Sequence, residues 1–535
     1  MNPRAHRPPA TKHRPDWGPP LSEYMPTFEN RLTESFDKYI TNQESISEAL
    51  NDLIPLNLLE TTLAVGENMH KVGFQHGDKI FPVLLSTIRK YTNLYKGGIF
   101  DYYYGFLCIR HLIRMVCIGA MRQCKRLDKF LNNIGSDAPW QEVTEDLAAS
   151  TLESMITVLC SENTAVVENL LGLLSRSGHA FAVDGGLSHE DVEFLIQTLW
   201  KDRKSLIPLR VCRLLPGLPA MLFVLSEMTV LSKNSIIKRP WLALEDLIFR
   251  CYIGDTNNPE REILRQLCIY IETFVLGRYH AISIDYIPAD KEDPRIVAGA
   301  YCAVFTPPME LSLAPIIQLD ISTMLFRWVL ELLGWKKGPL AGEDLVPHII
   351  KSAMARLTLE IDLEWSGPML KQNRAFTNRY AGEVFGYTSS LVINEQVLTS
   401  DVQTALIEML MEFDFHGLAG RVLMLVTRET SPEPPSFDEL YMSCRHMNKA
   451  FNILPTPSPE QLASIALVWR KVFLVLMHHQ QSSLTHAPRK LIGEAIEAWD
   501  LLRPPSVKRP PDLFECTNPR HWSLGTSDSH RLKCQ

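Results

Sequence analysis

The sequence predicts a mostly all-α protein built as a multi-helix array. Apolar residues recur at three- and four-residue steps in segment after segment, the spacing that places them on one face of an α-helix. Helix-capping residues mark the ends of several of these segments. The 535 residues are 46% hydrophobic and 21% charged, a balance that can bury one or more large cores. This length allows about three or four domains or one continuous array.

The clearest helix is expected over 258–277. Asn258 can cap its first turn, Pro259 suits the first helical position because it has no amide hydrogen, and Gly277 suits the left-handed residue that ends a helix. Between these ends runs an apolar stripe: Ile263, Leu264, Leu267, Cys268, Ile271, Phe274 and Val275. Such a stripe has to be covered by neighbouring elements, so this helix is expected inside a larger domain.

A second well-marked helix is expected to start at Ser458, where Ser458, Pro459 and Gln461 form a capping box. The segment that follows is apolar on nearly all sides, which is typical of a central helix in a large domain. Arg470 and Lys471 interrupt it and argue against a membrane span. Further helices are expected to start near Asp146, Thr164, Ser188, Pro240, Thr323, Asp344, Asp401, Asp438 and Arg489.

One region also carries a strand-like pattern. Residues 359–365 alternate apolar and acidic side chains, the period of a half-buried strand, but apolar residues from Leu345 to Ile361 also keep helical spacing. The helix is favoured because an isolated strand without a partner is unstable. Weaker strand candidates are Ile282, Ile284, Tyr286, Leu391 and Ile393. A minor sheet within 278–395 is therefore the alternative to an entirely helical chain.

Proline is concentrated in three regions, with 18 of 35 prolines in 1–26, 432–459 and 503–535. Proline-rich polar segments bury too little apolar surface to fold. The predicted organisation is a disordered basic tail (1–26), a helical array (27–428), a Pro-rich linker (429–437), C-terminal helices packing on the array (438–502) and a flexible tail (503–535).

Charge follows the same division. Residues 1–20 and 503–535 each carry +3, which leaves −13 for the rest of a chain whose total is −7. An acidic body disfavours nucleic acid as a partner, since binding to phosphates needs clustered positive charge. The basic tails can contact anionic lipid, which is the basis of one alternative function below.

The sequence predicts an intracellular protein, cytoplasmic or nuclear and not secreted. No apolar run precedes Pro26, and no stretch of 18 residues is free of charge, so neither a secretory signal nor an integral membrane span is expected. The chain has no Asn-x-Ser/Thr sequon. Its eleven cysteines include no Cys-x-x-Cys pair, as expected of reduced thiols.

No local signature of a catalytic, phosphate-binding or metal site is present. Cys108, His111, Cys117 and Cys124 would point to opposite faces of one helix, so they are interpreted as core residues. No metal and no cofactor are predicted. The acidic residues Glu360, Asp362 and Glu364 are interpreted as a solvated face. Glu360 or Glu364 would serve only the alternative function of an all-α enzyme with a buried small-molecule site.

An aromatic run from Tyr91 to Phe106 is the candidate binding site. Gly97 and Gly98 predict a turn between two helices there, and three consecutive tyrosines, 102–104, diverge by about 100° per residue on a helix. At least one is therefore expected to be partly exposed, where tyrosine suits a partner contact. The predicted contacts are Tyr95, Tyr102, Tyr103, Arg110 and Arg114. The alternative is aromatic packing at the corner of a helix hairpin.

Two basic groups accompany this corner. Arg110 and Arg114 share a helix face in the first group and can grip a carboxylate or a phosphate. The second group is Lys201, Arg203, Lys204, Arg210 and Arg213. For both groups the alternative is that they are solvated flanks of helices or partners for acidic helices.

The string of paired helices resembles the armadillo/HEAT class of α-solenoids over 27–428 and 438–502. Helix lengths vary and no fixed period repeats, so an irregular multi-helix array is the alternative. The resemblance implies a protein–protein interaction or scaffold module that binds a protein or peptide without catalysis. The two alternatives are the all-α enzyme and a peripheral membrane adaptor acting through the basic tails.

Overall fold

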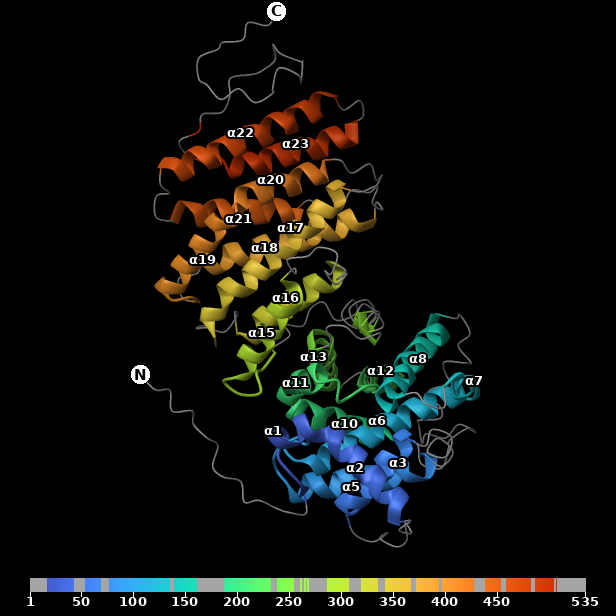
Figure 1. The fold of residues 1–535 in the computed structure, drawn as a ribbon. Coiled ribbons are helices and arrows are strands. Elements are labelled where there is room, and N and C mark those ends of the chain that lie inside the picture. Colours follow the sequence, from blue (N-terminus) through green and yellow to red (C-terminus); the bar gives the residue numbers. More distant parts are fainter. Residues whose placement is uncertain are drawn as a thin grey trace, which may run out of the picture. The chain divides into compact units, whose positions relative to one another are not determined.

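The computed structural model describes residues 17–42, 53–68, 77–134, 139–160, 187–231, 238–254, 286–306, 319–334, 342–366, 372–393, 397–427, 438–453, 459–482 and 486–504, with short pieces at 260–261, 264–265, 267–268 and 507. The regular structure of these residues is helical, with no strand among them, which confirms the predicted all-α class (Figure 1). The chain divides into two compact units, Met1–Ala300 and Tyr301–Gln535, called unit 1 and unit 2.

Helix α6 (Tyr103–Gln123) is the central helix in the first half of unit 1. It is apolar on nearly all sides, and 94% of the stretch Tyr103–Arg122 is buried, as expected for such a helix. The helices that pack directly on α6 include α3 (Leu56–Asn68), α5 (Gly77–Leu94), α7 (Leu127–Asn133), α8 (Trp140–Cys160) and α12 (Leu218–Leu231). The chain before α3 forms α1 (Leu21–Tyr24), η2 (Met25–Thr27) and α2 (Phe28–Asn42).

Helix α13 (Lys238–Gly254) organises the second half of unit 1. The elements around it are α10 (His189–Lys201), η3 (Arg203–Ser205), α11 (Leu206–Val211) and α12 (Leu218–Leu231). Helix α10 begins with a capping box, in which Ser188 and Asp191 each accept a hydrogen bond from the other residue's backbone amide. This confirms the helix start predicted at Ser188. Helix α15 (Asp293–Phe305) contains the boundary between the units.

Unit 2 is built from long helices (Figure 1). They are α16 (Leu319–Leu332), η6 (Glu343–Leu345), α17 (Val346–Ser366), α18 (Gln372–Ile393), α19 (Ser400–Glu412), α20 (Phe415–Val426), α21 (Asp438–Ile453), α22 (Pro459–Ser482) and α23 (His486–Leu501). Helix α18 packs on α16, α17 and α21, while α22 packs on α20 and α23. Helix α22 begins at Pro459, as its capping residues predict.

Two tryptophans join the last two helices of unit 2. The indole N–H of Trp469 donates to the carbonyl of Trp499 at 3.0 Å, and the indole N–H of Trp499 donates to the carbonyl of Trp469 at 2.9 Å. Both side chains are completely buried. Each ring therefore buries its apolar surface while its single polar atom is satisfied, which fixes one face of α22 inward.

The alternative of a minor sheet is wrong where the structure describes the chain. Residues 359–365 belong to α17 and Leu391 to α18, because the apolar residues of each segment also keep the helical period. Tyr286 has no regular structure. Ile282 and Ile284 lie outside the described residues. Of the helix predicted over 258–277, the described pieces at 260–261, 264–265 and 267–268 are helical.

The boundaries of the chain's organisation also differ from those predicted. The predicted tail 1–26 includes Trp17 and Tyr24, which are buried in unit 1 because their rings pack on other aromatic side chains. Unit 1 ends at Ala300, inside the predicted array 27–428, where the sequence offers no linker. The predicted linker 429–437 lies outside the described residues, as does most of the predicted tail 503–535.

Candidate functional site

The predicted aromatic corner forms a buried cluster in unit 1. Trp17 lies edge-on to Tyr91, Tyr95 and Tyr102, with ring centroids 5.3, 5.0 and 5.8 Å apart. Tyr103 is tilted against the ring of Tyr24 at 5.4 Å. Tyr102, Tyr103 and Tyr104 are all buried, and Tyr103 is 0% exposed. The expectation that at least one of these three tyrosines is exposed is wrong.

Two features of the chain explain this burial. Tyr102 precedes helix α6 in an extended conformation, so the three side chains do not follow the helical rotation that the expectation assumes. The segment from Trp17 to Phe28 then covers the side of the corner that would face solvent, with Tyr24 and Phe28 both against Phe106. These rings therefore pack against one another at the corner of a helix hairpin, which is the alternative to an exposed binding site.

The hydroxyl groups of the corner are also satisfied within unit 1. Tyr103 donates to the Glu60 carboxylate at 3.0 Å, and Tyr95 donates to Asp101 at 2.6 Å. Burial raises the pKa of the Tyr103 hydroxyl well above its usual range, and the nearby Glu60 charge adds to the effect. The hydroxyl is therefore a permanent donor that ties α6 to α3.

The two predicted arginine contacts are buried as well. Arg110 donates to the carbonyl of Leu214, and Arg114 donates to the carbonyl of Gly66. These two hydrogen bonds attach α6 to two different parts of unit 1. Of the five predicted partner contacts, only Tyr95 is half-buried and the other four are buried.

The cysteine and histidine residues of α6 behave as core residues. Cys108 and Cys117 are buried free thiols, and burial raises the pKa of Cys117 to about 12. His111 contacts the carbonyl of Leu59 at 2.8 Å, and burial lowers the pKa of its imidazole to about 4. No three His, Cys, Asp or Glu side chains among the described residues are placed to hold a metal ion.

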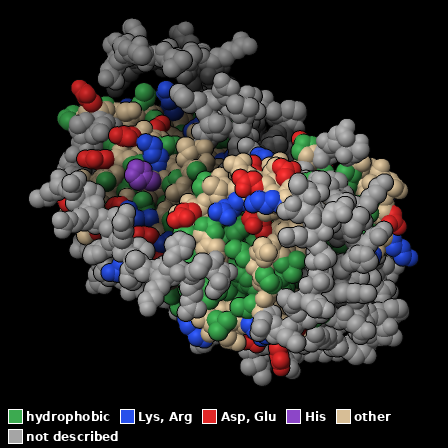
Figure 2. Space-filling model, turned by 60° about the horizontal axis from the view of Figure 1, so that its bottom comes forward, with side chains coloured by type: hydrophobic (Ala, Val, Ile, Leu, Met, Phe, Trp, Pro, Cys, Tyr) green, Lys and Arg blue, Asp and Glu red, His purple; other side chains and the backbone are tan. Residues whose placement is uncertain are grey.

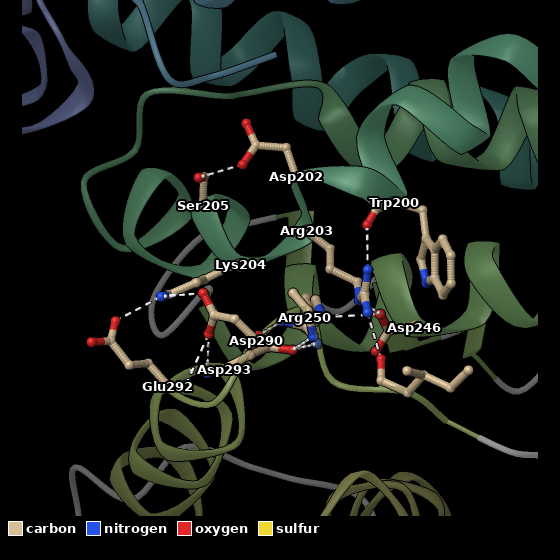
Figure 3. A network of polar contacts seen from close by, with 12 residues as sticks. Trp200, Asp202, Arg203, Lys204, Ser205, Asp246, Arg250, Asp290, Glu292 and Asp293 are labelled. Carbon is tan, nitrogen blue, oxygen red and sulfur yellow. Dashed lines mark hydrogen bonds and ion pairs between the residues drawn. The ribbon is translucent and has the colours of Figure 1, made fainter. Parts of the chain in front are cut away.

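Unit 1 also contains a buried ionic network that the sequence did not predict (Figure 3). Arg250 is its centre and is 0% exposed. Its guanidinium binds Asp293 with two hydrogen bonds of 2.6 and 2.9 Å and donates a third to Asp246 at 3.1 Å. Arg203 forms an ion pair with the same Asp246 at 3.2 Å and donates to the carbonyl of Trp200 at 2.7 Å.

Unit 1 contains three further polar contacts of this kind. Arg210 pairs with Glu260 at 3.0 Å, and Glu260 also accepts the amide hydrogen of Gly217 at 2.8 Å. Tyr286 donates to Glu245 at 2.6 Å. Nearer the surface, Lys204 pairs with Asp290 and Glu292, at 2.7 Å in both cases. The contacts around Arg250 thus join η3, α13 and the start of α15, while Arg210 and Glu260 form a separate buried pair.

The network's chemistry is structural. Its buried carboxylates accept hydrogen bonds from arginine, tyrosine or backbone donors, so their oxygen atoms are bound by groups of the protein itself. The interpretation of Arg203 and Arg210 as partners of acidic residues is confirmed. Arg250 stands in an apolar run, from Leu247 to Ile253, and this is the sequence signal that marks a buried arginine.

Asp202 is a further buried acid near this network, and its pKa is strongly raised. Its carboxylate accepts hydrogen bonds from the amide of Phe100 and from Ser205, the latter at 2.8 Å. Gly98 approaches so closely that a Cβ there would lie 2.5 Å from the carboxyl carbon. Burial raises the pKa of Asp202 to about 7, and the negative charge of Asp101 adds to the rise, while the two hydrogen bonds and Lys201 oppose it.

This raised pKa predicts a pH-dependent stability. The folded chain holds the Asp202 proton more tightly than the unfolded chain, whose carboxyl titrates near 3.8, so this group's contribution weakens as the pH rises from about 4 through about 7. The Asp202→Asn variant avoids the buried charge. The difference in free energy of unfolding, variant minus wild type, should therefore be larger at pH 8 than at pH 4. The increase should be on the order of 3 kcal/mol. Urea unfolding at the two pH values measures this, and a pH-independent difference would contradict it.

Of the acidic residues of α17, Asp362 is exposed and Glu360 is largely buried. Arg356 forms an ion pair with Glu360 one turn along the helix, and Arg421 pairs with Asp362 at 2.6 Å. The side chain of Glu364 lies outside the described residues. The interpretation of a solvated face describes Asp362 but not Glu360, whose largely buried carboxylate is paired with Arg356.

Basic and acidic side chains lie close together on the surface. On the face drawn in Figure 2, Lys and Arg lie beside Asp and Glu across the described area, with hydrophobic side chains among them. Arg89 pairs with Asp191 at 2.8 Å, and Arg213 lies 3.8 Å from Glu145. Surface arginines of unit 1 thus also have acidic neighbours.

Helix α22 of unit 2 is an apolar helix that its neighbours cover only in part. Its stretch Leu462–Ser482 is apolar and long enough to cross a membrane by length and composition, as is Tyr103–Arg122 of α6, but only 22% of it is buried. Leu467 is 54% exposed, and Leu474, two turns later, is half-buried. In Figure 1, α22 lies at the edge of unit 2, with α23 and α20 on its inner side.

Comparison with known proteins adds no further assignment. The chain matches no protein family model, and no curated protein or solved structure is significantly similar to it.

Proposed function

We propose that the chain is a non-catalytic interaction or scaffold module that binds a protein partner through the outward face of α22. One observation carries the proposal: α22 is apolar over most of its length, yet most of the stretch Leu462–Ser482 is not buried within the described structure. Exposed apolar surface is unfavourable in water and typically marks an interaction site. The opposite face of the same helix is held firmly by Trp469, so the outward face is presented on a rigid support.

This proposal places the partner-binding residues on α22 and no longer at the aromatic corner. The sequence placed them at Tyr95, Tyr102, Tyr103, Arg110 and Arg114, which are mostly buried in unit 1. The armadillo/HEAT-like stacking of the helices remains part of the proposal, because a stack of helices offers long exposed faces to a protein partner. The expected partner is a protein or a peptide, and the expected location is intracellular.

The proposal predicts that one exposed leucine controls partner capture. In the full chain, Leu467→Gln removes the exposed large apolar side chain of α22. Captured partner should fall by about tenfold, the effect of losing one well-packed contact. The free energy of unfolding should change by no more than about 0.5 kcal/mol, because the side chain is on the surface. Affinity capture with quantitative mass spectrometry, together with urea unfolding, measures both quantities.

A matched control is available in unit 1. Leu94, near the end of α5, is 59% exposed, so Leu94→Gln makes the same chemical change on another helix. Proteins that bind through α22 should be retained by this control and lost by Leu467→Gln. Equal capture by the two variants and the wild type would contradict the proposal.

A further inference from the structure

The outward face of α22 combines apolar and basic side chains, and this combination identifies the kind of partner that fits it. The inference rests on the function proposed above. At about 100° per residue, Leu467 and Leu474 lie within about 20° of each other on the helix. Arg470 and Lys471 lie on opposite sides of this leucine pair, about 60° and 40° from Leu467, and both are exposed.

The two basic residues have no acidic partner among the described residues. Neither forms an ion pair in the described structure of unit 2, and the only acidic residue on α22 is Glu460. Glu460 precedes Arg470 by ten residues, or about 15 Å along the helix, which is beyond the screening length of about 8 Å at physiological ionic strength. The middle of the outward face is therefore positively charged.

This charge disfavours a second copy of the chain as the occupant. Arg470 and Lys471 are at the midpoint of α22, which runs from Pro459 to Ser482. Two copies packed antiparallel across a two-fold axis through this midpoint would place each basic pair against its own copy. Like charges directly opposed across a helix interface are destabilising.

The direction of the aromatic side chains disfavours a lipid surface. Helices that lie in a membrane interface present Trp or Phe outward on their apolar face. On α22, Trp469 and Phe473 point into unit 2, where both are buried and their rings stack at 4.9 Å. The outward face carries two leucines between two cations, a pattern that matches the seam of a helix pair.

We propose that the outward face of α22 binds an acidic amphipathic helix of another protein. The apolar stripe of that helix covers Leu467 and Leu474, and its flanking carboxylates lie beside Arg470 and Lys471. Burial of the leucines supplies affinity, while the two charge pairs select an acidic helix over a basic one.

A pair of designed peptides tests this selection on the full chain. Each peptide is a helix of about three heptads with leucines along one stripe, flanked by glutamates in one peptide and by lysines in the other. At low salt the glutamate peptide should bind the wild type at least about tenfold more tightly. The double variant Arg470→Glu/Lys471→Glu should reverse this preference. Fluorescence anisotropy with labelled peptides measures all four affinities.

Each outcome of this test is decisive. No preference for either peptide, or the same preference in the double variant, would overturn the inference. Binding of phosphatidylserine vesicles that Leu467→Gln abolishes would replace the helix with a membrane, and self-association in sedimentation experiments that this variant abolishes would replace it with a second copy. If the native partner is lost with Leu467→Gln but retained by the double variant, the proposed function stands and the acidic partner does not.

Discussion

Replacing Arg250 with methionine should lower the free energy of unfolding of unit 1 by about 3–5 kcal/mol. The substitution keeps an unbranched apolar side chain but removes the cation that binds Asp293 and Asp246. Both carboxylates are buried, so Asp293 would lose its arginine partner in a region of low dielectric constant, and Asp246 would keep its ion pair with Arg203 but lose that with Arg250. Urea unfolding followed by circular dichroism measures the loss.

Two further variants identify the cause of this loss. Lys204→Met removes a cation near the surface, whose acidic partners Asp290 and Glu292 are largely exposed, and should cost no more than about 1 kcal/mol. Adding Asp293→Asn to Arg250→Met removes the buried carboxylate charge that has lost its arginine partner. This double variant should recover part of the lost stability. A loss below about 1 kcal/mol for Arg250→Met would show that the network is not a stabilising feature of the fold.

Replacing Tyr103 with alanine should lower the free energy of unfolding by about 3–5 kcal/mol, as for other large buried aromatic side chains. The ring is completely buried and packs on Tyr24, Phe28 and Phe106. Tyr103→Phe keeps the ring and loses only the hydrogen bond to Glu60, so it should cost about 1 kcal/mol. Thermal and urea unfolding of the two variants measure this difference.

The alanine variant also separates two views of the aromatic corner. If Tyr103 were a surface contact for a partner, Tyr103→Ala would bind the partner poorly and retain the melting temperature of the wild type. Burial of the ring leads to the opposite expectation, which is a lower melting temperature. An unchanged melting temperature would contradict the packing of the segment from Trp17 to Phe28 over this corner.

The parts of the fold that depend on neighbouring residues could be predicted from the sequence. Helix starts at Ser188 and Pro459 follow from capping groups within three residues. The helix over 359–365 follows from continuity with the apolar residues before it, because a strand there would have no pairing partner. These features depend on contacts within about one or two helical turns, which a single sequence displays directly.

The candidate site could not be predicted in the same way, because it depends on contacts between distant residues. Tyr24 donates to the carbonyl of Phe100, 76 positions away, and this packing determines that the tyrosines of the corner are buried. Arg250 and Asp293 are 43 positions apart. The exposure of Leu467 depends on where α20 and α23 pack against α22, and the period of α22 alone suggests a helix buried on all sides.

Site-specific photo-crosslinking tests the claim that the outward face of α22 contacts a protein partner. A photoreactive amino acid is placed at position 467 of the full chain in cells, and separately at position 94 as the exposed control. Irradiation should produce a cross-linked protein from position 467 that position 94 does not produce, with the cross-link mapping to an acidic helix. Absence of any adduct specific to position 467, while the chain remains folded, would contradict the claim.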